Sequence, residues 1–278
     1  MDKKIILFFI TTICMISFSS CGNSEHSKAQ ERYDRAQQLF QSGNWDDALE
    51  VLAEIDSLYP GQIEIRRMVT HLRPQIIEKQ TLQQLTETDS LLALATWQGD
   101  SMGVQVRRVS NLIEGYFVSK NAPADINSSH GIYGRLAPDA TFYIIAVSPG
   151  VKANCIRLSV DGESITAPKL PYDGERCAAY GKNYVMTYMH GEIDDLAKMI
   201  LQHKGSPMTV EFLNDGVSAG HVNLSAQQGR NVAELYEIVN NVTNMKLLAI
   251  RKAKLEKQLE LSRSQIARTT IDSVSPNR

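Results

Sequence analysis

The sequence predicts an α+β protein in which helical segments at both ends flank a central antiparallel β domain. Apolar residues recur at intervals of three, four and seven over residues 62–95, and they are spaced similarly over 226–268, which is the period of amphipathic helices. Between residues 103 and 224 the apolar runs are short and rich in Val, Ile, Tyr, Phe and Thr, as in strands. Asp161-Gly162 and Asp215-Gly216 separate such runs and are typical of hairpin turns.

Residues 1–20 have the layout of a secretory signal peptide. Lys3 and Lys4 precede a fourteen-residue apolar run, and two serines follow it. A helix of that run spans about 21 Å, short of the roughly 30 Å of a bilayer core, so a permanent membrane span is the weaker interpretation.

The segment Phe18-Ser19-Ser20-Cys21 resembles the lipobox of bacterial lipoproteins. The resemblance implies cleavage before Cys21, acylation of Cys21, for example with palmitate, and anchoring of the mature chain in the outer membrane, facing the periplasm or the cell surface. Ordinary secretion with cleavage and an uncleaved anchor are the alternatives. The whole chain also resembles uncharacterised envelope lipoproteins, which implies no activity.

The net charge argues against nucleic-acid binding, and the cysteine content leaves one candidate disulfide. The formal charge is −2, and it becomes −3 without the signal, which carries Asp2, Lys3 and Lys4. Such a chain without a Lys/Arg block does not favour nucleic-acid binding. With the signal and the lipidation site set aside, Cys155 and Cys177 remain. Outside the cytoplasm they could pair as a disulfide, and the alternative is two buried, reduced side chains.

A polar tether is expected over residues 21–28, and a helical stalk over 29–95. The stalk begins with helices over Ala29–Gln41 and Trp45–Tyr59, separated by a Ser-Gly-Asn turn and ended by Pro60. The sequence therefore predicts an antiparallel helical hairpin.

This hairpin resembles one tetratricopeptide repeat, a helix pair of about 34 residues. Arg32 and Arg35 stand where that family carries apolar residues, and Ile55 stands where it carries Ala. The resemblance implies docking of a peptide or protein, with a purely structural cap as the alternative. The matching positions are Ala36, Leu39, Gly43, Trp45, Ala48, Leu52 and Pro60.

A single repeat leaves one face uncovered, and an amphipathic helix over residues 62–95 is expected to cover it. Pro74 is expected to kink or split this helix. The helix over 226–268 has an imperfect heptad pattern and is expected to pack with it, leaving an ordinary solvated face. The alternative for its basic segment, 246–268, is contact with anionic lipid. A flexible tail is expected over 269–278.

The β domain, residues 103–224, is expected to form an antiparallel sandwich or barrel. One helix, over Glu192–His203, interrupts the strands. The predicted strands are Ile132–Leu136, Thr141–Val147, Ile156–Val160, Tyr184–Tyr188, Val210–Leu213 and Val217–Leu224.

Common catalytic and metal-binding patterns do not fit the β domain. The glycines of Gly174–Asn183 lack the spacing of a phosphate loop. His190, Glu192, Asp194 and His221 match no common metal spacing, and a surface turn is preferred. We expect no catalytic residue, no metal and no cofactor.

Tyrosines offer a binding surface instead. Tyr172, Tyr180 and Tyr184 lie near Arg176 in the sequence, and phenol rings beside polar groups can bind a sugar or a protein. The alternative is that Tyr184 and Tyr188 pack the sheet with exposed hydroxyls.

The resulting hypothesis is a lipid-anchored scaffold or protein-binding lipoprotein of the cell envelope without catalytic activity. Its partners would be the membrane, through the lipid, and an unidentified envelope protein or glycan, but no nucleic acid. The alternative is a carbohydrate-binding surface lipoprotein that uses the Tyr-rich face. Four Asp-Ser-apolar segments, beginning at Asp56, Asp89, Asp100 and Asp272, also resemble O-glycosylation acceptors.

Overall fold

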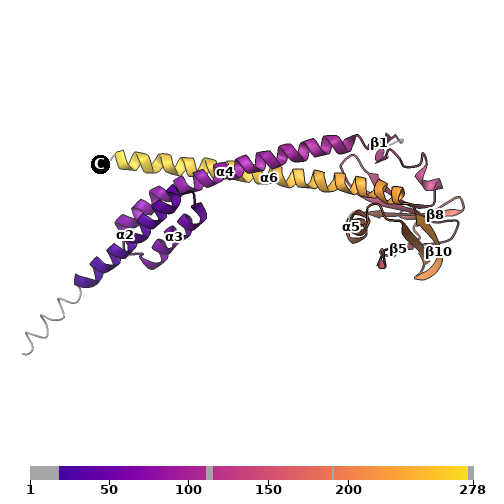
Figure 1. The fold of residues 1–278 in the computed structure, drawn as a ribbon, viewed down its shortest axis with the longest axis horizontal. Helices are drawn as coiled ribbons and strands as arrows, with labels where there is room; N and C mark the ends of the chain where they lie inside the picture. The colour runs from indigo at the N-terminus through magenta and orange to yellow at the C-terminus, as the bar shows by residue number, and fades with distance from the viewer. Residues whose placement is uncertain (1–18, 111–114, 190, 275–278) are drawn as a thin grey trace, which may run out of the picture. The chain divides into compact units, whose positions relative to one another are not determined.

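The computed structural model describes residues 19–110, 115–189 and 191–274, and it confirms the mixed α+β class (Figure 1). The chain forms two compact units. Unit 1 combines the segment up to Leu91 with the segment from Ala249 onward, and unit 2 is Leu92–Leu248. Helices α4 (Ile63–Gly103) and α6 (Ala226–Val274) each contribute to both units.

Unit 1 is helical and begins with the predicted hairpin. Helices α2 (Ser19–Gln41) and α3 (Trp45–Leu58) are joined at Gly43, whose φ of 83° favours glycine. Arg32 of α2 pairs with Glu54 of α3, and His26, earlier in α2, contacts Gln62, just after α3, so the two helices are antiparallel.

Helix α4 covers the hairpin, as predicted. Its apolar residues at three- and four-residue intervals share a core with α2 and α3. Pro74 lies inside α4 but does not split it, and the helix continues beyond the predicted end at residue 95. The core consists of Ala29, Tyr33, Ala36, Ala48, Val51, Leu52, Ile55, Ile65, Val69, Leu72 and Ile76.

The expected tether over residues 21–28 is wrong as local structure. Helix α2 begins at Ser19 and includes this segment. Beyond Gly22 the tether contains no Gly or Pro, so its backbone can remain helical. It continues directly into the part of α2 that packs on the core of unit 1, beginning with Ala29.

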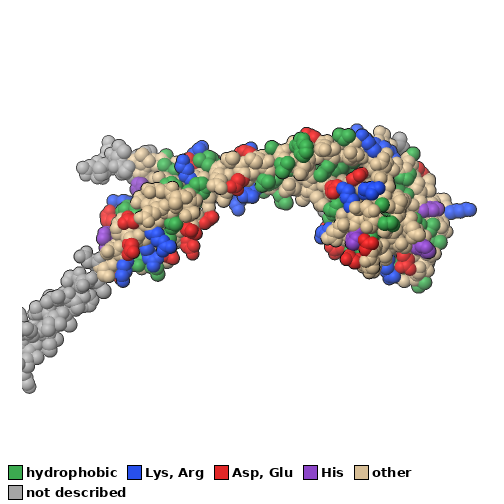
Figure 2. Space-filling view, viewed as in Figure 1, with side chains coloured by type: hydrophobic (Ala, Val, Ile, Leu, Met, Phe, Trp, Pro, Cys, Tyr) green, Lys and Arg blue, Asp and Glu red, His purple; other side chains and the backbone are tan. Residues whose placement is uncertain are grey.

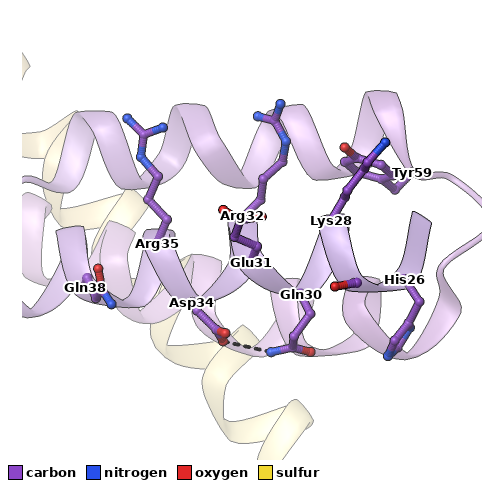
Figure 3. Close-up of a pocket in the computed structure, with 10 residues that line it drawn as sticks. His26, Lys28, Gln30, Glu31, Arg32, Asp34, Arg35, Gln38 and Tyr59 are labelled. Carbon is purple, nitrogen blue, oxygen red and sulfur yellow. Dashed lines mark hydrogen bonds between the residues drawn. The ribbon is translucent and has the colours of Figure 1, made fainter. Parts of the chain in front are cut away.

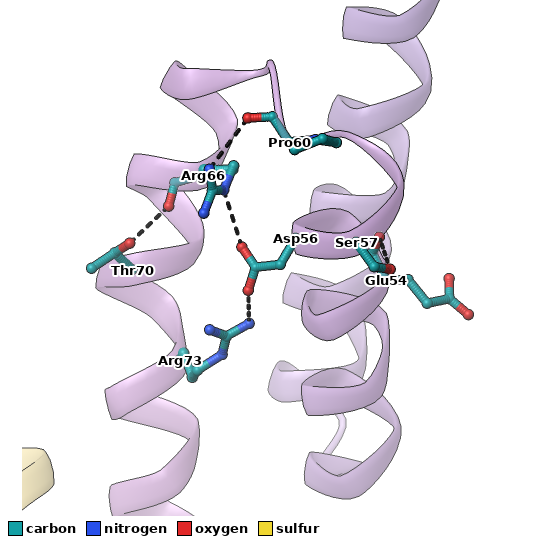
Figure 4. A network of polar contacts seen from close by, with 7 residues as sticks. All are labelled: Glu54, Asp56, Ser57, Pro60, Arg66, Thr70 and Arg73. Atoms are coloured by element: carbon teal, nitrogen blue, oxygen red, sulfur yellow. Dashed lines mark hydrogen bonds and ion pairs between the residues drawn. The ribbon is translucent and has the colours of Figure 1, made fainter.

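A polar network joins α3 to α4 (Figure 4). The carboxylate of Asp56 accepts hydrogen bonds from Arg66 Nε at 3.4 Å and Arg73 Nη2 at 2.5 Å. Arg66 also donates to the Pro60 carbonyl at 3.2 Å. Burial raises the pKa of Asp56, but the bonds and charges of Arg73 and Arg66 outweigh burial, so the pKa lies below its usual value.

Within unit 1, α6 packs against α4, as predicted, and the two helices run antiparallel. Lys252 pairs with Asp89 at 2.7 Å, whereas Arg263, further along α6, pairs with Glu78, earlier in α4, at 2.9 Å. Two cations of the predicted basic segment thus meet acidic partners. The predicted flexible tail is also wrong in part, since α6 remains helical to Val274.

Unit 2 contains two antiparallel sheets and agrees with the predicted sandwich. The six-stranded sheet has the order β1-β2-β3-β4-β8-β7, and the four-stranded sheet has the order β10-β9-β5-β6. The strands are β1 Val106–Val109, β2 Tyr116–Ser119, β3 Gly131–Leu136, β4 Phe142–Val147, β5 Cys155–Val160, β6 Glu163–Thr166, β7 Cys177–Tyr180, β8 Asn183–Met189, β9 Met208–Asn214 and β10 Val217–Leu224.

The core of unit 2 lies between the sheets. Ile144 and Tyr188 of the larger sheet and Phe212 of the smaller one belong to one cluster with residues of α5 (Asp194–Gln202) and α6. Leu235 of α6 lies so close to β3 that a Cβ at Gly134 would be 2.7 Å from its Cδ1. The sheet can therefore accept α6 because position 134 has no side chain.

Both predicted hairpin turns are present. Asp161 and Gly162 have φ of 50° and 88°, and Asp215 and Gly216 have 52° and 90°, as in two-residue type I′ turns. The strands absent from the prediction, β1, β2, β6 and β7, each have four residues, too few for a clear alternating pattern.

Candidate functional site

The tyrosines singled out in the sequence lie in different places. Ala179 is paired with Tyr184 across β7 and β8, and Tyr180 with Asn183. Because successive side chains of a strand alternate between faces, Tyr180 and Tyr184 project from opposite faces of the sheet. The predicted group of Tyr172, Tyr180, Tyr184 and Arg176 is therefore not assembled as one surface.

Tyr172 and Tyr184 do meet. Their ring centres are 5.8 Å apart in an edge-to-face arrangement. The hydroxyl of Tyr172 donates to Asn214 Oδ1 at 2.6 Å, and Lys152 Nζ lies 4.3 Å from the centre of the Tyr172 ring. Burial, followed by the neighbouring Cys177, Asp215 and Tyr184, raises the pKa of Tyr172 to about 12.

One buried asparagine positions this region. Asn154 is 1% exposed. Its side chain donates to Asp215 Oδ1 at 3.1 Å and accepts from the Asp215 backbone N–H at 3.0 Å. The backbone carbonyl of Asn154 accepts a hydrogen bond from the backbone N–H of Leu170 at 2.8 Å. The side chain and the backbone carbonyl of Asn154 together thus tie the β9–β10 turn to the loop that carries Tyr172. The sequence analysis missed Asn154 because its partners are distant in the chain.

Asp215 also pairs with Lys169, Oδ1 to Nζ, at 2.6 Å. Hydrogen bonds from Lys169 and Asn154 hold the pKa of Asp215 below its usual value. We call Lys152, Asn154, Lys169, Tyr172, Tyr184, Asn214 and Asp215 the Tyr172 cluster. The Tyr172 phenol is neutral at pH 7, and the Asp215 carboxylate is paired. The cluster therefore offers hydrogen bonds and aromatic surface, which suit ligand recognition better than catalysis.

The other two predicted binding residues have separate roles. Tyr180 is 48% exposed, and its hydroxyl lies 3.4 Å from Asp125 Oδ2. Arg176 Nη2 donates to Glu192 Oε2 at 2.6 Å, which links β7 to the segment before α5. Tyr188 is fully buried, so the alternative with exposed hydroxyls does not describe it.

Both cysteines of the β domain are free and buried, so the candidate disulfide is not formed. The Cys155 thiol lies 3.2 Å from the Ala167 carbonyl, and the Cys177 thiol lies 3.3 Å from the Ala153 carbonyl. Burial raises the pKa of Cys155. Burial, together with the negative charge of Asp173, raises the pKa of Cys177 to about 11.

The predicted lipidation site, Cys21, lies in the first turn of α2, where the structure describes the backbone alone. Further along α2, a polar hollow of about 1140 Å³ is lined by residues including Lys28, Arg32, Arg35 and Tyr59 (Figure 3). Arg32 and Arg35, which depart from the tetratricopeptide pattern, thus line a surface hollow.

Several large apolar side chains are exposed on the helices, and Figure 2 shows such side chains along α4. In unit 2, Leu94 is 50% and Trp97 68% exposed. Ala95 of the same segment is buried, and its carbonyl accepts from Asn241 Nδ2 of α6 at 2.9 Å. Leu94 and Trp97 are therefore outside the face that α4 uses against α6.

Membrane-spanning and metal-binding features are absent from the described residues. None of the helices there combines the length and apolar character needed to cross a bilayer. Within the same ranges, no three His, Cys, Asp or Glu side chains are grouped as metal ligands, and His190 lies outside these ranges. All four serines of the Asp-Ser-apolar segments lie in helices. Ser57 and Ser90 donate to backbone carbonyls.

Comparison of the chain with protein-family models, with curated proteins and with solved structures found no match.

Proposed function

We propose that this chain is a non-catalytic, lipid-anchored protein of the bacterial cell envelope that binds another protein through α4. The lipidated Cys21 would supply the anchor and place the chain at the outer membrane. The observation that carries the binding role is the exposure of Leu94 and Trp97 on a helix whose opposite side is already packed.

The geometry of α4 separates the packed side from the free side. At about 100° per residue, Leu94 lies about 100° and Trp97 about 160° around the helix from Ala95. A Cβ at Gly99 would be 2.9 Å from Asn241 Nδ2, so Gly99 also faces α6. Leu94 and Trp97 are thus available to a partner without any change in the α4–α6 contact.

The chemistry of this pair favours a protein partner. Tryptophan is enriched among the residues that dominate binding energy in interfaces. Apolar side chains spaced i, i+3 on a helix are the pattern that enters a hydrophobic groove. The partner is therefore expected to present an apolar groove that accepts the Trp97 ring.

Site-specific photocrosslinking in intact cells tests this proposal. A photoreactive amino acid at position 97 is expected to capture a defined protein, identified by mass spectrometry. The same amino acid at Lys182, an exposed polar position of unit 2, is the matched control. Adding Leu94→Ser to the probe at position 97 should reduce capture. Equal capture from positions 97 and 182, or no capture at position 97, would contradict the proposal.

A carbohydrate-binding role is the second candidate, and the Tyr172 cluster is the observation that favours it. Lys152 and Tyr184 already contact the Tyr172 ring, which leaves less of it for a sugar than an open aromatic face would. A glycan array with Tyr172→Ala and Tyr180→Ala variants tests the two sheet faces separately. Selective binding that either Tyr172→Ala or Tyr180→Ala abolishes would contradict a pure scaffold.

A further inference from the structure

Two large apolar side chains are exposed at the turn between α3 and α4. Leu58 is 57% and Ile63 70% exposed. They flank Tyr59, Pro60 and Gly61 and belong to neither the core of unit 1 nor the partly buried residues packed on it, although Tyr59 packs there. Folding of unit 1 therefore does not require these two side chains to be apolar.

The same turn lies beside the beginning of α2. His26 Nδ1 and Gln62 Oε1 are 3.1 Å apart. The Arg32 guanidinium lies 6.0 Å from the centre of the Tyr59 ring, and Figure 3 shows Tyr59 at the His26 and Lys28 end of α2. The antiparallel hairpin brings the end of α3 to the level of His26, seven residues after the start of α2.

This position is close to the proposed lipid. His26 comes five residues after Cys21 in α2, a rise of about 7.5 Å along the helix. The polar interfacial layer on each side of a bilayer core is about 5–8 Å thick. Acyl chains on Cys21 would therefore bring the α3–α4 turn within reach of the membrane interface.

The two arginines in the first turns of α4 already have partners. Arg66 bonds Asp56 and the Pro60 carbonyl, and Arg67 lies 4.0 Å from Glu64. Attraction to lipid would therefore come mainly from the apolar side chains and the Tyr59 ring, an amphipathic side chain typical of membrane interfaces. Such a contact should depend little on salt.

From this geometry we infer that the α3–α4 turn is a second membrane contact, in which Leu58 and Ile63 enter the interface of the bilayer that holds the acylated Cys21. The inference rests on the proposed lipid anchor. With two points of contact, α2 and α3 would be held in a defined orientation at the membrane, whereas a lipid alone would allow the chain to swivel.

Quenching by brominated lipid tests this contact. The full acylated chain, carrying a fluorophore on Ile63→Cys, is reconstituted into vesicles of phosphatidylethanolamine and phosphatidylglycerol with brominated acyl chains. Ile250→Cys is the matched control, because Ile250 is another apolar side chain of unit 1 and is 67% exposed. The labelling background is measured on the chain without an added cysteine.

The probe at position 63 is expected to be quenched at least about twofold more than the probe at position 250. High salt should leave this difference unchanged. Equal quenching at the two positions would overturn the inference, as would quenching at position 63 that high salt removes.

Flotation of the same preparation with vesicles separates the two levels of the proposal. A chain that carries no fatty acid and does not float contradicts the lipid anchor itself. A chain that floats and shows equal quenching at both positions contradicts only the second contact. A Leu58→Ser variant tests the second apolar side chain of the turn, because it should lower quenching at position 63 while flotation persists.

Discussion

The amide of Asn154 shows how much one residue contributes to the candidate site. Its side chain is buried, and both the nitrogen and the oxygen of the amide form hydrogen bonds with Asp215. Its backbone carbonyl accepts a hydrogen bond from Leu170. Removing a buried partner leaves other polar groups unsatisfied, which costs more than the lost bond.

We predict that Asn154→Ala lowers the free energy of unfolding by about 1–3 kcal/mol. Urea denaturation of the full chain measures the effect. Asn223→Ala is the control, because Asn223 is exposed and should change stability by no more than about 0.5 kcal/mol. Equal effects of the two substitutions would show that Asn154 is not a structural centre.

The cysteines make a second prediction at the residue scale. Because burial raises both thiol pKa values, and that of Cys177 to about 11, little thiolate exists at pH 8. We expect Cys177 in the folded chain to react with iodoacetamide at least about 100-fold more slowly than an exposed cysteine. Unfolding without reductant should expose two reactive thiols of the β domain, and a count of zero would indicate a disulfide.

Among the elements, the contact between α3 and α4 depends on both apolar packing and the Asp56 network. The side chain of Asp56 is about one-third exposed, and those of Arg66 and Arg73 are exposed to a similar or greater degree. Each ion pair therefore contributes at most about 1 kcal/mol to the free energy of unfolding. The apolar core of unit 1 therefore carries most of the stability, and the network adds a pH-dependent part.

We predict that Asp56→Asn lowers the free energy of unfolding at pH 7 by about 1 kcal/mol. The pKa of Asp56 is below its usual 3.8 in the folded chain, so the contribution is present above that value and is lost as pH falls through the folded pKa. The wild-type and variant curves should converge on acidification below 3.8. Asp34→Asn is the control, because exposed Asp34 bonds only Gln30 among the described residues. A gap of constant size at all pH values would contradict this account.

The elements also show where prediction from sequence succeeds. The hairpin of α2 and α3, the cover by α4 and the two Asp-Gly turns were predictable, because helix period and turn chemistry are local properties. The four-residue strands were not, since strands such as β6 owe their place to pairing with β5. The start of α2 was also missed, because a polar composition predicts solvent exposure better than it predicts an irregular backbone.

For the whole molecule, the proposed function depends on acylation of Cys21. In cells fed an alkyne-tagged fatty acid, the wild-type chain should carry label and be recovered with outer membranes. Cys21→Ala should abolish the label, whereas Cys155→Ala should retain it. Label that persists in Cys21→Ala would refute the anchor.

By itself, the sequence determined the α+β class, the helical ends, the antiparallel β domain and the hypothesis of a lipid anchor, because each depends on composition or on short-range pattern. Only the tertiary structure decided that Tyr180 and Tyr184 project from opposite faces, that Asn154 joins distant segments, and that the α3–α4 turn, with its exposed Leu58 and Ile63, contacts α2 at His26. The physical reason is that strand register and helix packing bring together residues far apart in the chain, and no local period encodes those distances.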